Sequence, residues 1–174
     1  MDSLKMNTPQ LSLHRILKQA LNGHNAHVDL QKALEGLKVN LTGRKILNAP
    51  YTIWQLIKHI NFWQDKFLSR LEGKQNYKLA GNWMEGWEEQ QNAEYQEELD
   101  REINRLHDGI TKTLKLLGQE EDCSICDLDY TNKYDIVQAM GSHLSYHLGE
   151  IILLRRIFGS WREPGKDSFY GSFR

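Results

Sequence analysis

One stretch of the chain, between Ile136 and Phe158, constrains the fold more than any other. Its apolar residues recur at steps of three and four, which is the spacing of one face of an α-helix. The same face carries two histidines four residues apart, so that the full stripe is Ile136, Met140, His143, His147, Ile151, Leu154 and Phe158. The stripe predicts a long helix with two imidazole rings on its buried side.

Two buried imidazole rings need partners, because a polar group that leaves water without a hydrogen bond costs roughly 1–3 kcal/mol in proteins. A shared divalent metal could satisfy His143 and His147 together, since histidines at positions i and i+4 can ligate one ion. Hydrogen bonds to other side chains or to water are the alternative. The pair is not the metalloprotease motif, because Leu144 stands where that motif requires a glutamate.

Composition favours a soluble protein with one domain. The 174 residues carry a formal net charge of −1, so neither a nucleic acid nor a membrane is the expected main partner. Two cysteines cannot build a disulfide framework and fit a reducing compartment. No apolar run has the length of a signal peptide or a membrane span. We therefore expect a cytoplasmic protein with one domain over residues 1–174, of which 160–174 form a short tail.

Proline placement and helical spacing predict an all-α fold. The three prolines, Pro9, Pro50 and Pro164, stand where elements should begin or end. Long helices are expected over about 8–23, 50–73, 88–117 and 132–159, with a short helix capped by Asp29 and closed by Gly36. The buried stripes of the first and third long helices are expected to be Leu13, Ile16, Leu17, Ala20 and Leu21, and Tyr95, Leu99, Ile103 and Leu106.

The connection after the second long helix indicates how the helices are ordered. A helix of some 20 residues is about 30 Å long, and a connection of a dozen residues reaches roughly 40 Å. The connection can therefore bring the chain back, so that the third long helix runs parallel to the second, as in bundles with a long crossover. Trp83 and Trp87, within this crossover, would cover one end of the bundle.

A third histidine lies on a second helix. His59 stands between Leu56 and Trp63 at steps of three and four, at the border of the buried face. It is either a residue at the shoulder of the helix or a third ligand. Glu150 could accept a hydrogen bond from a ligand imidazole, or it could face solvent. Candidate pocket walls, each with core packing as the alternative, are Tyr51, Trp54, Trp63 and Trp83.

Two further groups of potential ligands have simpler interpretations. His24 and His27 lie near a helix end, where exposed or capping histidines are common, although ligation stays open. Cys123 and Cys126 supply half of a zinc site, and no second pair exists in the sequence. They lack the βαβ context of a redox motif, so we interpret them as free thiols, with a redox or metal role as the alternative.

The segments that carry these histidines resemble a known family. Residues 50–64, with His59, and residues 141–156, with His143 and His147, look like segments of the DinB/YfiT-like superfamily. Residues 25–37 are also similar to one branch of it, and the resemblance extends from about Thr8 to Trp161. It implies a four-helix bundle of up-down-down-up order, often a homodimer. It also implies a divalent metal held by His59, His143 and His147.

Three imidazole ligands and an open position are typical of a catalytic metal site. They suit Zn²⁺ or Ni²⁺, with Fe, Co or Mn as alternatives. The expected activity is that of a metal-dependent hydrolase or, as in some members of the superfamily, a thiol-dependent transferase, acting on a small-molecule substrate. The sequence identifies no general base. The alternative is a metal-binding dimer without turnover, acting as a stress-related interaction protein. Binding to DNA is not expected, because the chain has no basic stripe.

Overall fold

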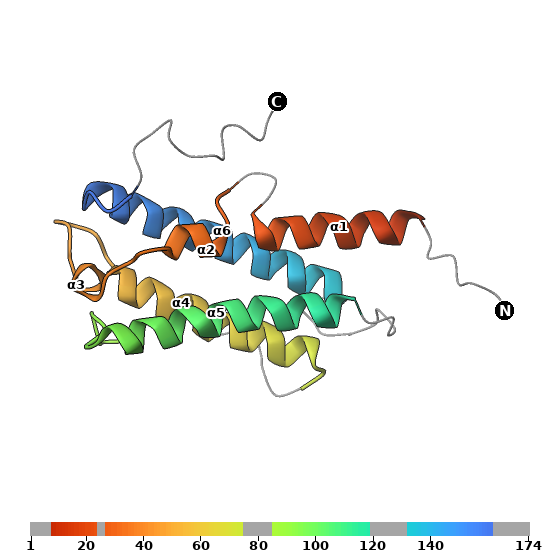
Figure 1. Ribbon diagram of the computed structural model, residues 1–174. Coiled ribbons are helices and arrows are strands. Elements are labelled where there is room, and N and C mark those ends of the chain that lie inside the picture. Colours follow the sequence, from red (N-terminus) through yellow and green to blue (C-terminus); the bar gives the residue numbers. More distant parts are fainter. Residues whose placement is uncertain (1–7, 24–26, 75–84, 119–131, 162–174) are drawn as a thin grey trace, which may run out of the picture.

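Helices make up the architecture of the protein. The computed structural model describes residues 8–23, 27–74, 85–118 and 132–161, and no strand occurs among them (Figure 1). The all-α class predicted from the sequence is therefore confirmed. The helices are α1 (Thr8–Asn22), α2 (Leu30–Leu34), α3 (Val39–Thr42), α4 (Ile53–Leu71), α5 (Gln96–Leu117) and α6 (Lys133–Ile157).

The first residues of α4 and α6 are held by side-chain caps. Thr52 forms a capping box with Gln55, in which the Thr52 hydroxyl accepts from the Gln55 amide and the Gln55 side chain accepts from the Thr52 amide. At the start of α6, the Asn132 side chain accepts from the amides of Tyr134 and Asp135. Side-chain hydrogen bonds to backbone amides thus cap both helices that carry the predicted ligands.

Helix α4 packs closely against both α5 and α6, and α4 and α5 cross in Figure 1. The Asn61 amide donates to both the carbonyl and the carboxylate of Glu102, and the Gln64 amide donates to the Arg105 carbonyl. A Cβ atom at Gly109 would lie 1.9 Å from Gln64 Nε2, so only glycine leaves the Gln64 amide in this position. The contacting residues advance together along both helices, which means that α4 and α5 run in the same direction.

Helix α6 runs opposite to α4 and forms the other half of the core. The His59 ring of α4 contacts His147, whereas Phe67, two turns further along α4, contacts His143, which precedes His147 on α6. The largest fully buried apolar side chains come mainly from these helices and α5, and they are Leu21, Ile53, Trp54, Leu56, Ile57, Leu99, Leu106, Ile136, Val137, Leu148 and Ile151.

The third long helix begins later than the sequence pattern indicates. We expected it from about residue 88, but α5 begins at Gln96. The preceding segment is held by side chains from elsewhere: Thr52 donates to the Gln91 carbonyl, and Gln55 donates to the Glu88 carbonyl. The Ala93 amide donates to Thr42 of α3, a short helix that was not expected. The Ala93 amide is thus not available for a helical ladder, and side chains from outside the segment hold its carbonyls in place.

Some residues of the predicted buried stripes face outward. Leu13 and Ile16 of α1 are exposed to 36% and 50%, and only Leu17 and Leu21 of that stripe are core residues. Tyr95 was expected inside but precedes α5 and is 65% exposed. Other predictions concern residues outside the described ranges: His24, Trp83, Cys123, Cys126 and the tail from residue 162. None of the helices among the described residues is both long and apolar enough to cross a membrane.

Candidate metal centre

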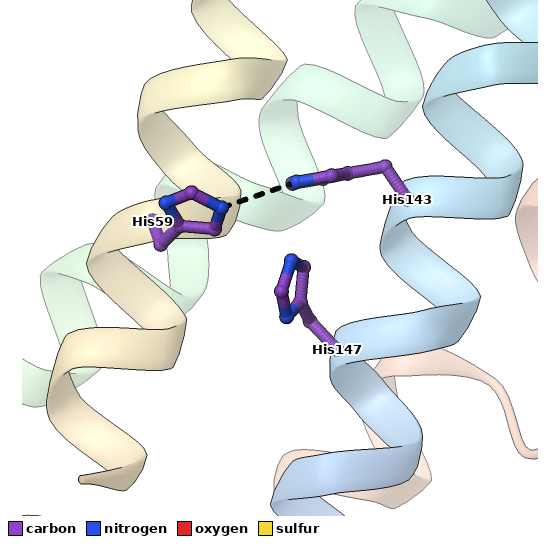
Figure 2. Close-up of side chains that lie close together, drawn as sticks. All are labelled: His59, His143 and His147. Carbon is purple, nitrogen blue, oxygen red and sulfur yellow. Dashed lines mark hydrogen bonds between the residues drawn. The ribbon is translucent and has the colours of Figure 1, made fainter. Parts of the chain in front are cut away.

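Helices α4 and α6 bring the three predicted ligands together. His59 projects from α4, and His143 and His147 project from successive turns of α6 toward it (Figure 2). One nitrogen from each ring can be chosen so that the three atoms all lie within 4.8 Å of one another. The structure therefore groups all three residues, and this group could hold a metal ion.

The spacing of the ring nitrogens suits a tetrahedral ion. His59 Nε2 and His143 Nε2 are 3.3 Å apart. Two nitrogens at zinc–nitrogen distances of 2.0–2.1 Å in tetrahedral geometry would be about 3.3–3.4 Å apart. Without an ion, one of the two rings would have to donate a proton to the other. The His147 ring centroid lies 4.8 Å from that of His59 and 4.5 Å from that of His143.

Burial keeps two of the rings neutral, as metal ligation requires. Loss of solvent, followed by repulsion from His147, lowers the pKa of His59 from its usual 6.5 to about 4, against a smaller opposing effect from the backbone of Gly86. Burial, followed by repulsion from the other two rings, lowers the pKa of His143 to about 3. At neutral pH both imidazoles therefore have a nitrogen lone pair that can bind a cation.

A carboxylate orients the third ring. Nδ1 of His147 lies 2.7 Å from a carboxylate oxygen of Glu150, one turn further along α6. An ionised carboxylate can only accept, so Nδ1 carries the proton and donates it. In the neutral form of this ring, Nε2 of His147 then has the lone pair that can ligate a cation. The possible role of Glu150 as the hydrogen-bond partner of a ligand imidazole, noted from the sequence, thus has matching geometry.

Aromatic rings surround the cluster. Trp63 lies with its ring centroid 6.3 Å from that of His59 and 6.1 Å from that of His143. Trp54, another candidate wall, is fully buried in the core. Tyr51 does not reach the histidines directly but stacks on Trp87. Trp87 itself stacks on His59, a contact that the sequence did not predict, because no spacing rule links an irregular segment to a helix 28 positions earlier.

Other histidines have partners outside the cluster. The two ring nitrogens of His27 lie 2.9 Å and 3.0 Å from the carbonyl oxygens of Val28 and Ala20, at the corner between α1 and α2. This agrees with a structural role for His27. His14 contacts the Tyr134 hydroxyl at 3.2 Å and connects α1 to α6.

Comparison with known proteins identifies the family. A search of curated proteins and a search of solved structures each found no significant match. The family model of the DinB superfamily matches residues 24–151. That range covers well over half of the chain and includes His59, His143 and His147. The chain belongs to the DinB superfamily.

Proposed function

We propose that this protein binds one divalent metal ion through Nε2 of His59, His143 and His147. The observation that carries the proposal is the convergence of three imidazoles from two helices, with two Nε2 atoms at 3.3 Å. Further support comes from the lowered pKa values of His59 and His143, because neutral rings are the ligating form. Three imidazoles without thiolate or carboxylate ligands favour Zn²⁺ or Ni²⁺ over Fe, Co or Mn.

The same arrangement favours an enzyme that acts on a small molecule. A site with three protein ligands leaves a coordination position for water or substrate. An ion bound there would supply Lewis acidity, which activates water or a thiol as a nucleophile. A hydrolase or a thiol-dependent transferase is therefore the activity that we propose.

Other side chains would orient the three histidines and line the metal site. Glu150 holds the proton on Nδ1 of His147, which keeps that ring in the tautomer needed for ligation. Trp63, Phe67 and Trp87 place apolar ring surface beside the histidines. Apolar surroundings of this kind strengthen electrostatic interactions with a bound ion.

Elemental analysis of the purified protein tests metal binding. After incubation with Zn²⁺ or Ni²⁺ and removal of free ions, we expect one ion per chain in the wild-type protein and a loss of that ion in His143→Ala. The matched control is His14→Ala, which removes an imidazole that contacts Tyr134 outside the cluster. Equal metal content in all three proteins would refute the proposal.

Activity is tested with metal-loaded protein on a panel of esters and amides, and of thiols paired with electrophiles. We expect turnover of one class, its loss on chelation, and its recovery when the metal is restored. Turnover of an ester or amide identifies a hydrolase, and turnover that depends on the thiol identifies a transferase. Metal binding without turnover on any of these would instead support the non-catalytic role.

We also propose that the protein forms a homodimer. Helix α6 exposes apolar side chains at steps of four and seven: Tyr146 is 67% exposed, Leu153 57% and Ile157 55%. Residues at this spacing lie on one face of a helix, and apolar surface of this kind is typical of an interface. Light scattering coupled to gel filtration would measure the mass of the protein in solution.

A further inference from the structure

The three candidate ligands are not held in the same way. His147 is oriented by its hydrogen bond to Glu150. His59, by contrast, has a buried Nδ1 atom without a hydrogen bond of normal geometry to any described residue, although a weaker interaction with the backbone of Gly86 acts on its ring. Rotation about the bond between Cβ and the ring of a histidine has broad, roughly two-fold preferences. Nδ1 of His59 therefore lacks, within the described part of the chain, a well-formed hydrogen bond like that of His147, and another contact must help to hold its ring with Nε2 toward the cluster.

A column of three aromatic rings supplies that restraint. The ring of Trp87 lies parallel to the ring of His59, with centroids 3.8 Å apart and planes 6° apart. Behind it, Tyr51 stacks on Trp87 at 3.3 Å and 3°. If the His59 ring turned out of its plane, it would collide with the indole. Tyr51 in turn limits how far the indole can retreat.

The segment that carries Trp87 is fixed in place on both sides. Gly86 has φ +84°, a conformation that residues with a side chain rarely adopt, and a Cβ atom there would lie 2.3 Å from the Phe62 ring. On the other side, the carbonyls of Glu88 and Gln91 accept hydrogen bonds from Gln55 and Thr52 at the start of α4. The indole therefore lies over His59 because its own backbone is anchored to the helix that carries His59.

We propose that Trp87 is a positioning residue for the metal ligand His59, acting through the flat face of its indole. The proposal rests on the metal binding proposed above. An imidazole that ligates a cation becomes poorer in electrons, so the electron-rich face of an indole attracts it more strongly once the ion is bound. Trp87 would thus favour the bound state as well as the ring orientation.

Two substitutions of Trp87 distinguish the effect of its flat aromatic face from the effect of its apolar volume. Trp87→Phe keeps a planar ring, whereas Trp87→Leu keeps apolar volume without one. We expect the Leu variant to bind Zn²⁺ about tenfold more weakly, at the lower end of the usual effect of removing a partner of a ligand, and the Phe variant to lie within about threefold of wild type. Competition with a chromophoric chelator measures both dissociation constants.

The control is Trp54→Leu, which removes a fully buried tryptophan of α4 from the core. It should lower the melting temperature of the metal-free protein while leaving the Zn²⁺ dissociation constant unchanged. A purely structural Trp87 would behave in the same way as this control. The visible absorption of the Co²⁺-loaded proteins gives a second readout, and it should change in Trp87→Leu but not in Trp87→Phe.

Wild-type affinity in Trp87→Leu, or equal weakening in the Leu and Phe variants, would overturn the role of the indole face while leaving metal binding intact. Absence of Zn²⁺ binding by the wild-type protein would overturn the proposed metal site, and with it this inference. Selective weakening in Trp87→Leu, with an altered Co²⁺ spectrum and a control that binds normally, would support it.

Discussion

Acidification should destabilise the metal-free protein through His59 and His143. Both rings have a lowered pKa in the folded protein, about 4 and about 3, against 6.5 in an unfolded chain. Between these limits the unfolded chain binds protons that the folded chain does not. Falling pH therefore favours unfolding. The stability is fully present above pH 6.5 and is lost as the pH falls toward the folded pKa values.

The change in the free energy of unfolding with pH follows from the number of protons that the chain takes up when it unfolds. At pH 5 each imidazole is almost fully protonated in the unfolded chain and almost neutral in the folded one. The two groups together therefore change the free energy of unfolding by roughly 2.5 kcal/mol per pH unit. This slope requires only that both folded pKa values lie well below 5. Between pH 6 and pH 5 the loss is about 2 kcal/mol, a large part of the stability of an ordinary domain.

Urea unfolding with a chelator present, at several pH values from 5 to 6, measures this slope. The comparison is between wild type and His143→Gln, which removes one titrating ring and keeps a polar side chain. All other ionisable groups are shared by the two proteins. Their slopes of unfolding free energy against pH should therefore differ by about 1.2 kcal/mol per pH unit, close to the largest slope that one proton can give. Identical slopes in the two proteins would refute the reasoning, because His143 would then titrate alike in both states.

Three more predictions follow from the contacts around the site. Glu150→Gln should weaken Zn²⁺ binding by roughly 10–100-fold, because an amide no longer fixes the proton on His147, and a chelator competition measures this; unchanged affinity would contradict it. Gly109→Ala should lower the free energy of unfolding by about 1 kcal/mol, because its Cβ would push the buried Gln64 amide off the Arg105 carbonyl, and this loss exceeds the gain from the helix preference of alanine; a urea titration equal to wild type would rule this out. Leu153→Lys should give a monomer by light scattering if the exposed face of α6 is the dimer interface, and a persistent dimer would locate the interface elsewhere.

Local rules were sufficient where a helix has its own start signal. Thr52 and Asn132 are capping residues by type, and the structure has helices that begin directly after them. The apolar spacing of residues 136–158 also predicted the correct side of α6, because a helix of that length offers one continuous face to its neighbours. These features depend on residues within a few positions of one another, which is why one sequence is enough to find them.

The segment before α5 needed information from distant residues. Its glutamates favour a helix start, and residue preferences alone extend the helix back to residue 88. In the structure, Thr42, Thr52 and Gln55 bind its backbone instead. The position of Trp87 over His59 follows from those same contacts. Both the wrong helix start and the missed stacking contact therefore have one cause, which is side-chain hydrogen bonding across more than 30 positions.

The convergence of the three histidines depends partly on local rules and partly on contacts between distant residues. Spacing on one helix places His143 and His147 together, but it says nothing of their height relative to His59 on α4. One helical turn is about 5.4 Å, and His143 and His147 are themselves one turn apart, so a slip of α6 by one turn would leave at most one of the two rings within reach of His59. The buried side chains of α6, such as Leu144, Leu148 and Ile151, would have to leave their places in the core for such a slip. The register of the core, more than the histidines themselves, thus decides whether a metal site can form.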